Sequence, residues 1–136
     1  MRAFFFGPDD RYPRGLYWTT LLVLAFDTAL YAFFFVDLLR HPRAGGDWYL
    51  HTRNVLGHFC AVICPLIMLI LVAAGFPEGL IVFSLTKMFL LLAVVGNFLG
   101  MGLIGERPDG RVYGALATWN LLALVTALVY WKVRNR

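Results

Sequence analysis

Apolar residues occur along the chain in four long runs, separated by short clusters of polar and turn-forming residues. The runs cover about Leu16–Leu39, Asn54–Gly75, Gly79–Ile104 and Val112–Trp131. Each is close to the roughly 20 residues that an α-helix needs to cross the hydrocarbon core of a bilayer. Apolar and polar residues do not alternate within the runs, as they would in the strands of a membrane β-barrel. The pattern predicts an all-α integral membrane protein with four spanning helices.

The three connections between the runs are short and contain residues that end helices, among them Pro42, Pro77 and Pro108. Short connections place consecutive helices side by side and antiparallel. We therefore expect an up-down-up-down four-helix bundle, forming a single transmembrane domain over residues 1–136. Residues 1–15 are expected to form an arm at the membrane surface.

Composition and charge agree with a membrane protein and not with a nucleic-acid-binding one. The chain is 60% hydrophobic and 15% charged, whereas soluble domains carry about 25% charged residues. The formal charge of +4 comes from basic residues clustered at the ends of the runs, where they anchor helices, and not from a basic stripe. The acid-free tail Lys132–Arg136 favours a cytoplasmic location for both termini, in a bacterial-type inner membrane.

Two ionisable residues lie well inside the predicted spans, Asp27 in the first and Lys87 in the third. A charge at the centre of a span costs about 2.5–3.5 kcal/mol on insertion scales and marks a functional or pairing site. The two helices run in the same direction, and the two residues lie at similar depths, so we expect an intramembrane ion pair. The pair is interpreted as a structural bridge or as a proton or ion relay. A Lys87 that extends to the surface, or an Asp27 that is neutral or faces a partner subunit, are further alternatives.

A second set of polar residues, His58, Asn97 and Asn120, lies nearer the membrane side that holds the first and third connections. Hydrogen bonds between spanning helices are common and contribute about 0.6 kcal/mol each on average. The alternative interpretation is a polar pocket that contacts the edge of a quinone or porphyrin, with His58 as ligand or hydrogen-bond donor. Only one histidine lies inside a span, so this chain alone lacks the two axial imidazoles of a membrane haem.

His58, Cys60 and Cys64 share one helical face, which makes them weak candidates for a soft metal ion. Small polarizable core residues explain the same pattern, and no metal is predicted. Pro65 in the same run is expected to kink its helix.

A stripe of small residues, Ala93, Gly96 and Gly100, lies in the third run. The Gly-x-x-x-Gly spacing is typical of close approach between membrane helices. It predicts tight packing against another helix, either of this chain or of a partner.

Two families share a few features with the chain. Small multidrug transporters resemble it in having one acid in the first helix, here Asp27, but they use glutamate and lack an intramembrane lysine. Four-helix porphyrinogen-oxidase-like membrane proteins are similar at Arg53, Pro65 and Lys87, but their histidine in the first helix is missing here. The chain is assigned to neither.

No catalytic triad, phosphate-binding glycine loop or metalloprotease helix is present in the sequence, which favours a non-catalytic role. The first hypothesis is a structural or accessory subunit of a larger membrane complex, for which redox or photosynthetic energy conversion is one option. The second is a small proton- or ion-coupled transporter centred on Asp27 and Lys87. The third is a porphyrin- or quinone-handling redox protein. The expected partners are membrane lipids and other membrane subunits. No cofactor other than lipid is predicted, and contact with a quinone or porphyrin at a subunit interface is an alternative.

Overall fold

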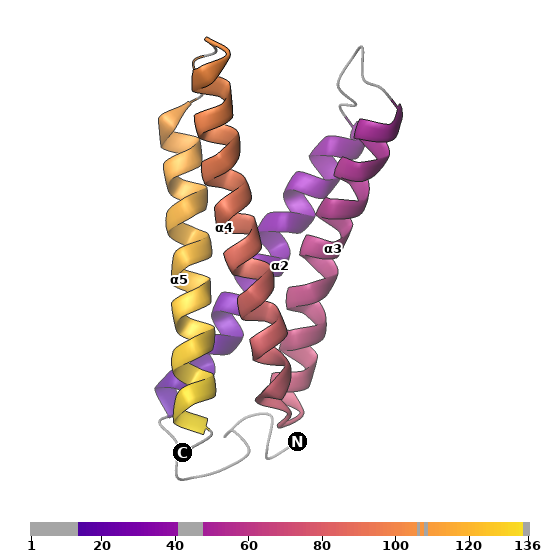
Figure 1. The fold of residues 1–136 in the computed structure, drawn as a ribbon. Coiled ribbons are helices and arrows are strands. Elements are labelled where there is room, and N and C mark those ends of the chain that lie inside the picture. Colours follow the sequence, from indigo (N-terminus) through magenta and orange to yellow (C-terminus); the bar gives the residue numbers. More distant parts are fainter. Residues whose placement is uncertain (1–13, 41–47, 106, 108, 135–136) are drawn as a thin grey trace. The chain divides into compact units, whose positions relative to one another are not determined.

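The computed structural model describes residues 14–40, 48–105, 107 and 109–134, with side chains described from Val55 onward in the second range. These residues form four long α-helices and no strand, which confirms the all-α prediction (Figure 1). The helices are α2 (Arg14–Arg40), α3 (Trp48–Ala73), α4 (Leu80–Leu103) and α5 (Gly110–Arg134), and the 3-10 turn η1 (Pro77–Gly79) precedes α4.

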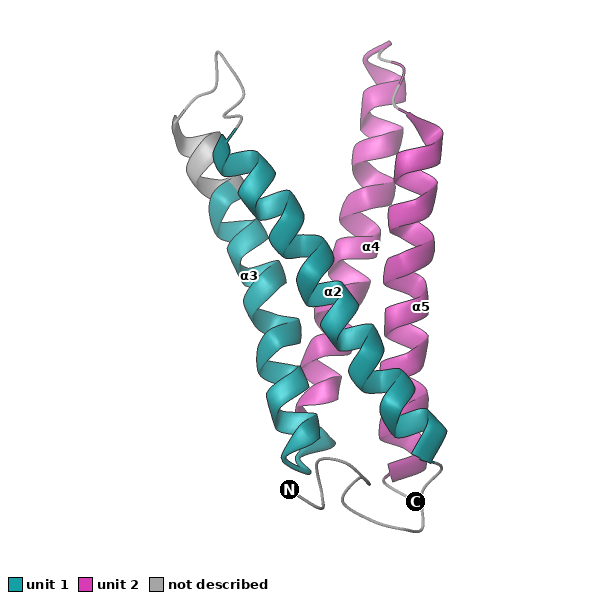
Figure 2. Cartoon of the chain, turned by 180° about the vertical axis from the view of Figure 1, so that it is seen from behind, with its two compact units in different colours: residues 1–77 teal, residues 78–136 magenta. Residues whose placement is uncertain are grey.

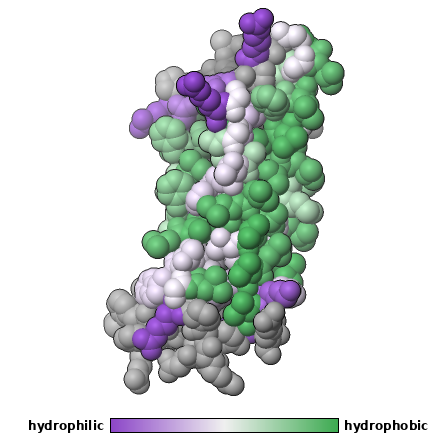
Figure 3. Space-filling model, turned by 90° about the vertical axis from the view of Figure 1, so that its left-hand side faces the viewer, coloured by the Kyte–Doolittle hydropathy of each residue, from purple (hydrophilic) through white to green (hydrophobic). Residues whose placement is uncertain are grey.

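All four helices contain a segment that is long and apolar enough to cross a membrane. Figure 3 shows one face of the molecule, on which hydrophobic side chains cover most of the middle and hydrophilic residues gather near the two ends. Large apolar side chains such as Leu22, Phe89 and Leu103 are exposed along the helices. In water such a surface would be unstable, whereas in lipid it is the expected one. The chain is therefore a multi-pass membrane protein.

The chain divides into two compact units, residues 1–77 and 78–136 (Figure 2). In the first, α2 packs against α3, and in the second, α4 packs against α5. Each pair runs antiparallel, so that each unit is a helical hairpin (Figures 1 and 2). The single transmembrane domain and the up-down-up-down order of all four helices stay predictions.

Helix α3 ends in a glycine turn just before the boundary between the units. Gly75 has a φ of 94°, a backbone conformation that costs glycine little because it has no Cβ. Its N–H donates to the Val72 carbonyl at 3.1 Å, and the Phe76 N–H donates to the Leu71 carbonyl at 2.8 Å. This is the Schellman pattern, which satisfies carbonyls at the helix end. Gly105, with a φ of 79°, follows α4, and its N–H donates to the Gly102 carbonyl at 3.2 Å.

Buried residues recur at intervals of three and four along each helix, which places them on one face. On α2 they are Tyr17, Thr20, Leu21, Leu24, Asp27 and Tyr31; on α3, Ala61, Pro65, Met68 and Val72; on α4, Leu80, Phe83, Ser84 and Lys87; on α5, Asn120, Ala123, Ala127 and Tyr130. The buried faces of α2, α4 and α5 thus include polar side chains, whereas that of α3 does not. The intramembrane chemistry of the described chain is concentrated on these three helices.

Candidate functional site

Two of the buried hydroxyl groups, those of Thr20 and Ser84, are satisfied by their own helix. Thr20 Oγ1 donates to the Leu16 carbonyl at 2.8 Å, and Ser84 Oγ donates to the Leu80 carbonyl at 2.7 Å. Serine and threonine commonly bond to the carbonyl four residues earlier. These two hydroxyls are therefore accounted for locally. The buried faces also carry two charged residues, Asp27 and Lys87, and one amide, Asn120.

Lys87 and Asn120 form a polar contact inside the α4–α5 hairpin. Lys87 is 1% exposed and Asn120 is 0% exposed, and Lys87 Nζ donates to Asn120 Oδ1 at 3.4 Å. The ammonium nitrogen also lies 5.3 Å from the centre of the Phe83 ring, within the range of a cation–π interaction. Two helices of one hairpin thus supply an acceptor and an aromatic face to a buried cation.

The orientation of the Asn120 amide is fixed by a second hydrogen bond. Asn120 Nδ2 donates to the Leu116 carbonyl, one turn earlier on α5, at 2.8 Å. With the amide nitrogen committed to its own helix, the oxygen is the atom presented to Lys87 Nζ. Because an ammonium group can only donate, this arrangement matches the donor to the acceptor.

Asp27 is 0% exposed and lies on the buried face of α2, between Leu24 and Tyr31. It belongs to the first compact unit and Lys87 to the second. The Asp27–Lys87 ion pair therefore stays a prediction. The structure bears on its two members separately: each is a buried ionisable residue within a span.

Of the second polar set, His58 belongs to the first unit and Asn97 and Asn120 to the second, so the grouping of the three stays a prediction. Asn120 contacts Lys87, Asn97 is exposed on α4, and His58 is half-buried on α3. Sequence reasoning missed the Lys87–Asn120 contact because it assigned these residues to different depths. Among the described residues, no three His, Cys, Asp or Glu side chains are grouped to hold a metal ion. Cys60 is exposed and Cys64 half-buried.

The stripe Ala93, Gly96 and Gly100 lies on the side of α4 away from its buried face. Gly96 follows Lys87 by nine residues, which is about two and a half helical turns and so the opposite side of the helix. Ala93 and Gly96 are exposed. A Cβ added at Gly96 or Gly100 would meet nothing within 4 Å. The α4–α5 hairpin therefore makes no use of the stripe.

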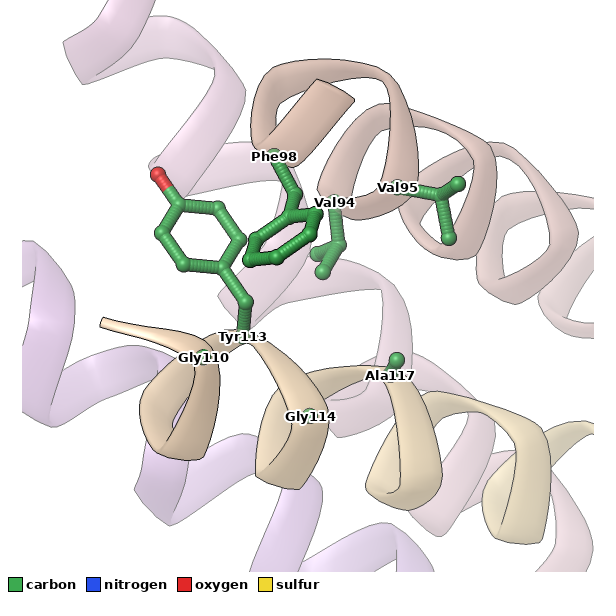
Figure 4. Close-up of a pocket in the computed structure, with 7 residues that line it drawn as sticks. All are labelled: Val94, Val95, Phe98, Gly110, Tyr113, Gly114 and Ala117. Atoms are coloured by element: carbon green, nitrogen blue, oxygen red, sulfur yellow. The ribbon is translucent and has the colours of Figure 1, made fainter. Parts of the chain in front are cut away.

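An apolar groove lies between α4 and α5 near their connection, with a cavity volume of about 190 Å³ (Figure 4). Helix α4 lines it with Val94, Val95 and Phe98. Helix α5 lines it with Gly110, Tyr113, Gly114 and Ala117. The Phe98 and Tyr113 rings meet at a centroid distance of 5.7 Å, and Tyr113 Oη donates to Met101 Sδ at 3.5 Å. Small residues on α5 thus leave a space that the two aromatic rings border.

Comparisons of the chain with protein-family models, with curated proteins and with solved structures found no match. The partial resemblances based on Asp27 and Lys87 gain no support from them. Function is therefore inferred from the residues and geometry described above.

Proposed function

We propose that the chain is a non-catalytic accessory subunit of a larger membrane complex, which it contacts through the outer face of α4, defined by Ala93, Gly96 and Gly100. The observation that supports the proposal is the position of this stripe opposite the buried face of its own helix. Redox or photosynthetic energy conversion is one setting for such a complex.

The outer face of α4 has the surface that helix association in lipid requires. Lipid chains are as apolar as leucine, so helices associate in membranes through close packing and not through the hydrophobic effect. Residues without long side chains allow two backbones to approach closely. A lipid-facing surface has no such need, and the neighbouring positions Leu92 and Leu99 are indeed large and exposed.

The proposal places the protein in a bacterial-type inner membrane with both termini cytoplasmic. The acid-free tail Lys132–Arg136 supports this orientation through the excess of basic residues found on cytoplasmic sides. The partner is then a spanning helix that offers its own small-residue face to α4.

Gentle extraction from the native membrane tests the proposal. We expect the tagged wild type to migrate in a particle that contains other membrane proteins, and Gly96→Leu to release it as a smaller particle. Gly57→Leu is the matched control, because Gly57 is an exposed glycine on spanning helix α3 with nothing within 4 Å of an added Cβ. A wild type that purifies alone, or a particle unchanged by Gly96→Leu, would contradict the proposal.

A second candidate function, a small proton- or ion-coupled transporter, is favoured by the burial of Asp27 and Lys87 in spanning helices. Ionisable residues inside membranes often belong to proton relays and ion pathways. In liposomes, Asp27→Asn would then abolish flux. Asp37→Asn is the control, because Asp37 is an exposed acid farther along the same helix. Equal flux for Asp27→Asn and the wild type would dismiss this candidate.

The quinone- or porphyrin-handling alternative is tested on the same purified fraction by its absorption spectrum and by solvent extraction. A Soret band or a stoichiometric quinone would favour it. A colourless, quinone-free preparation would count against it.

A further inference from the structure

We propose that the groove between α4 and α5 holds one acyl chain of a membrane phospholipid. The glycerol ester carbonyl of this lipid accepts a hydrogen bond from the Tyr113 hydroxyl, and Arg111 binds its phosphate. This site is separate from the Lys87–Asn120 contact and from the outer face of α4. It makes one bound phospholipid a constituent of the protein, in addition to the lipid that surrounds it.

The groove has the position and length of the upper part of a lipid chain. Gly110 is the first residue of α5, and Ala117 follows it by seven residues, so the lining runs from the helix end to a depth of about 10 Å. All seven lining residues lie on two membrane-spanning helices. A groove at this depth in a bilayer meets hydrocarbon, and its walls offer hydrocarbon and aromatic carbon in return.

The groove is open on the α5 side because glycines line it there. A Cβ at Gly110 would lie 3.9 Å from Phe98, whereas a Cβ at Gly114 would meet nothing within 4 Å. In a hairpin closed by small residues, the facing helix would fill this space. Here the space at Gly114 is left for a flexible chain, which can follow an irregular wall.

Tyr113 places a hydrogen-bond donor at the end of the groove nearer the helix terminus. Its ring lines the groove while its hydroxyl is directed away from Ala117 (Figure 4). The acceptor of that hydroxyl is the Met101 thioether at 3.5 Å, and a thioether is a weak acceptor. An ester carbonyl is a stronger one, and tyrosine at the level of the lipid headgroups is a common membrane anchor.

Charge at the same helix end matches a phosphate group. Arg111 is exposed in the first turn of α5, and Arg107 is exposed in the connection before it. The nearby acid Asp109 caps the helix by accepting the Arg111 backbone N–H at 3.0 Å, and its single charge leaves the two arginines in excess over it. Glu106 lies outside the described residues. Guanidinium groups bind phosphate through paired hydrogen bonds, and phosphate is common to all phospholipid headgroups.

Native mass spectrometry of the full-length protein measures the proposed occupancy directly. The protein is delipidated in mild detergent and titrated with dioleoyl phosphatidylglycerol or dioleoyl phosphatidylcholine. We expect one tightly retained phospholipid on the wild type. Ala117→Leu should reduce its retention by about tenfold, because the new side chain occupies the groove. Tyr113→Phe should reduce it by about fivefold, the effect of one neutral hydrogen bond.

Ala115→Leu is the matched control, since Ala115 is an exposed alanine on α5, two residues before Ala117 and near the opposite face of the helix. Retention like that of the wild type in this variant, with loss in Ala117→Leu, supports the proposal. Equal retention in all variants would mean that only surrounding lipid is detected, and would overturn it. Preferential retention of an isoprenoid quinone would also overturn it. So would a lower melting temperature of lipid-free Ala117→Leu, which would show that protein already fills the groove.

Discussion

Replacing Asn120 by leucine removes the amide oxygen that accepts the Lys87 hydrogen bond and leaves the buried ammonium with one acceptor fewer. A hydrogen bond to a charged group contributes about 1.5–3 kcal/mol in soluble proteins, whereas interhelical hydrogen bonds in membranes average about 0.6 kcal/mol. The observed 3.4 Å distance is longer than the usual range of about 2.7–3.2 Å. We therefore expect a coupling free energy of about 1 kcal/mol between the two side chains.

A double-mutant cycle isolates this value. Asn120→Leu should lower the free energy of unfolding by about 1 kcal/mol more in the wild type than in Lys87→Met, where no cation needs the acceptor, because its other losses, such as the bond to the Leu116 carbonyl, are the same in both backgrounds. The measurement is equilibrium unfolding in mixed micelles with increasing sodium dodecyl sulfate, followed by circular dichroism. Thr118→Val serves as the control, because the Thr118 hydroxyl bonds to Gly114 on its own helix and should show no coupling to Lys87. If Asn120→Leu costs the same in both backgrounds, the Lys87–Asn120 contact contributes nothing and the reasoning is wrong.

Three further predictions concern packing, orientation and metal. Ala123 is fully buried on α5, so Ala123→Leu should lower the free energy of unfolding by about 1–3 kcal/mol through overpacking, whereas exposed Ala115→Leu should leave it unchanged in the same micelle titration. A reporter protein that is active only in the cytoplasm should be active when it is fused after Arg136. If instead only a reporter that requires the periplasm is active there, the orientation is the reverse. Because Cys60 and Cys64 belong to no metal-binding group among the described residues, an excess of chelator should not change the melting temperature, and a fall would reveal a bound metal.

The spanning helices could be predicted from hydropathy, but their ends could not. Helix α3 begins at Trp48, six residues before the predicted start at Asn54. The intervening residues are polar enough to end an apolar run, yet they contain no glycine or proline to end a helix. Helix α5 extends to Arg134 for the same reason. Hydropathy locates the membrane, whereas backbone preferences set the limits of a helix, and the two differ at the surface.

The contact of Lys87 with Asn120 could not be predicted from the sequence because it depends on helix register and side-chain length. Val94 and Ala117 line the same groove, so in an antiparallel pair Asn120 lies near residue 91, one turn from Lys87. Only a side chain as long as lysine spans that offset. Counting residues from the ends of the runs put the two groups in separate layers. The small-residue stripe, by contrast, was recognisable from its spacing, but the side of α4 on which it lies required the positions of the buried residues.

The internal contact of the α4–α5 hairpin has a consequence for how the chain enters the bilayer during synthesis. A lone lysine at the centre of a span raises the free energy of insertion by about 2.5–3.5 kcal/mol. Lys87 finds its acceptor Asn120 on the very next helix, 33 residues later. Once both helices have left the ribosome, they can partition together from the translocon with the ammonium already bonded. The second hairpin thus supplies one acceptor for its own buried charge as it enters the bilayer.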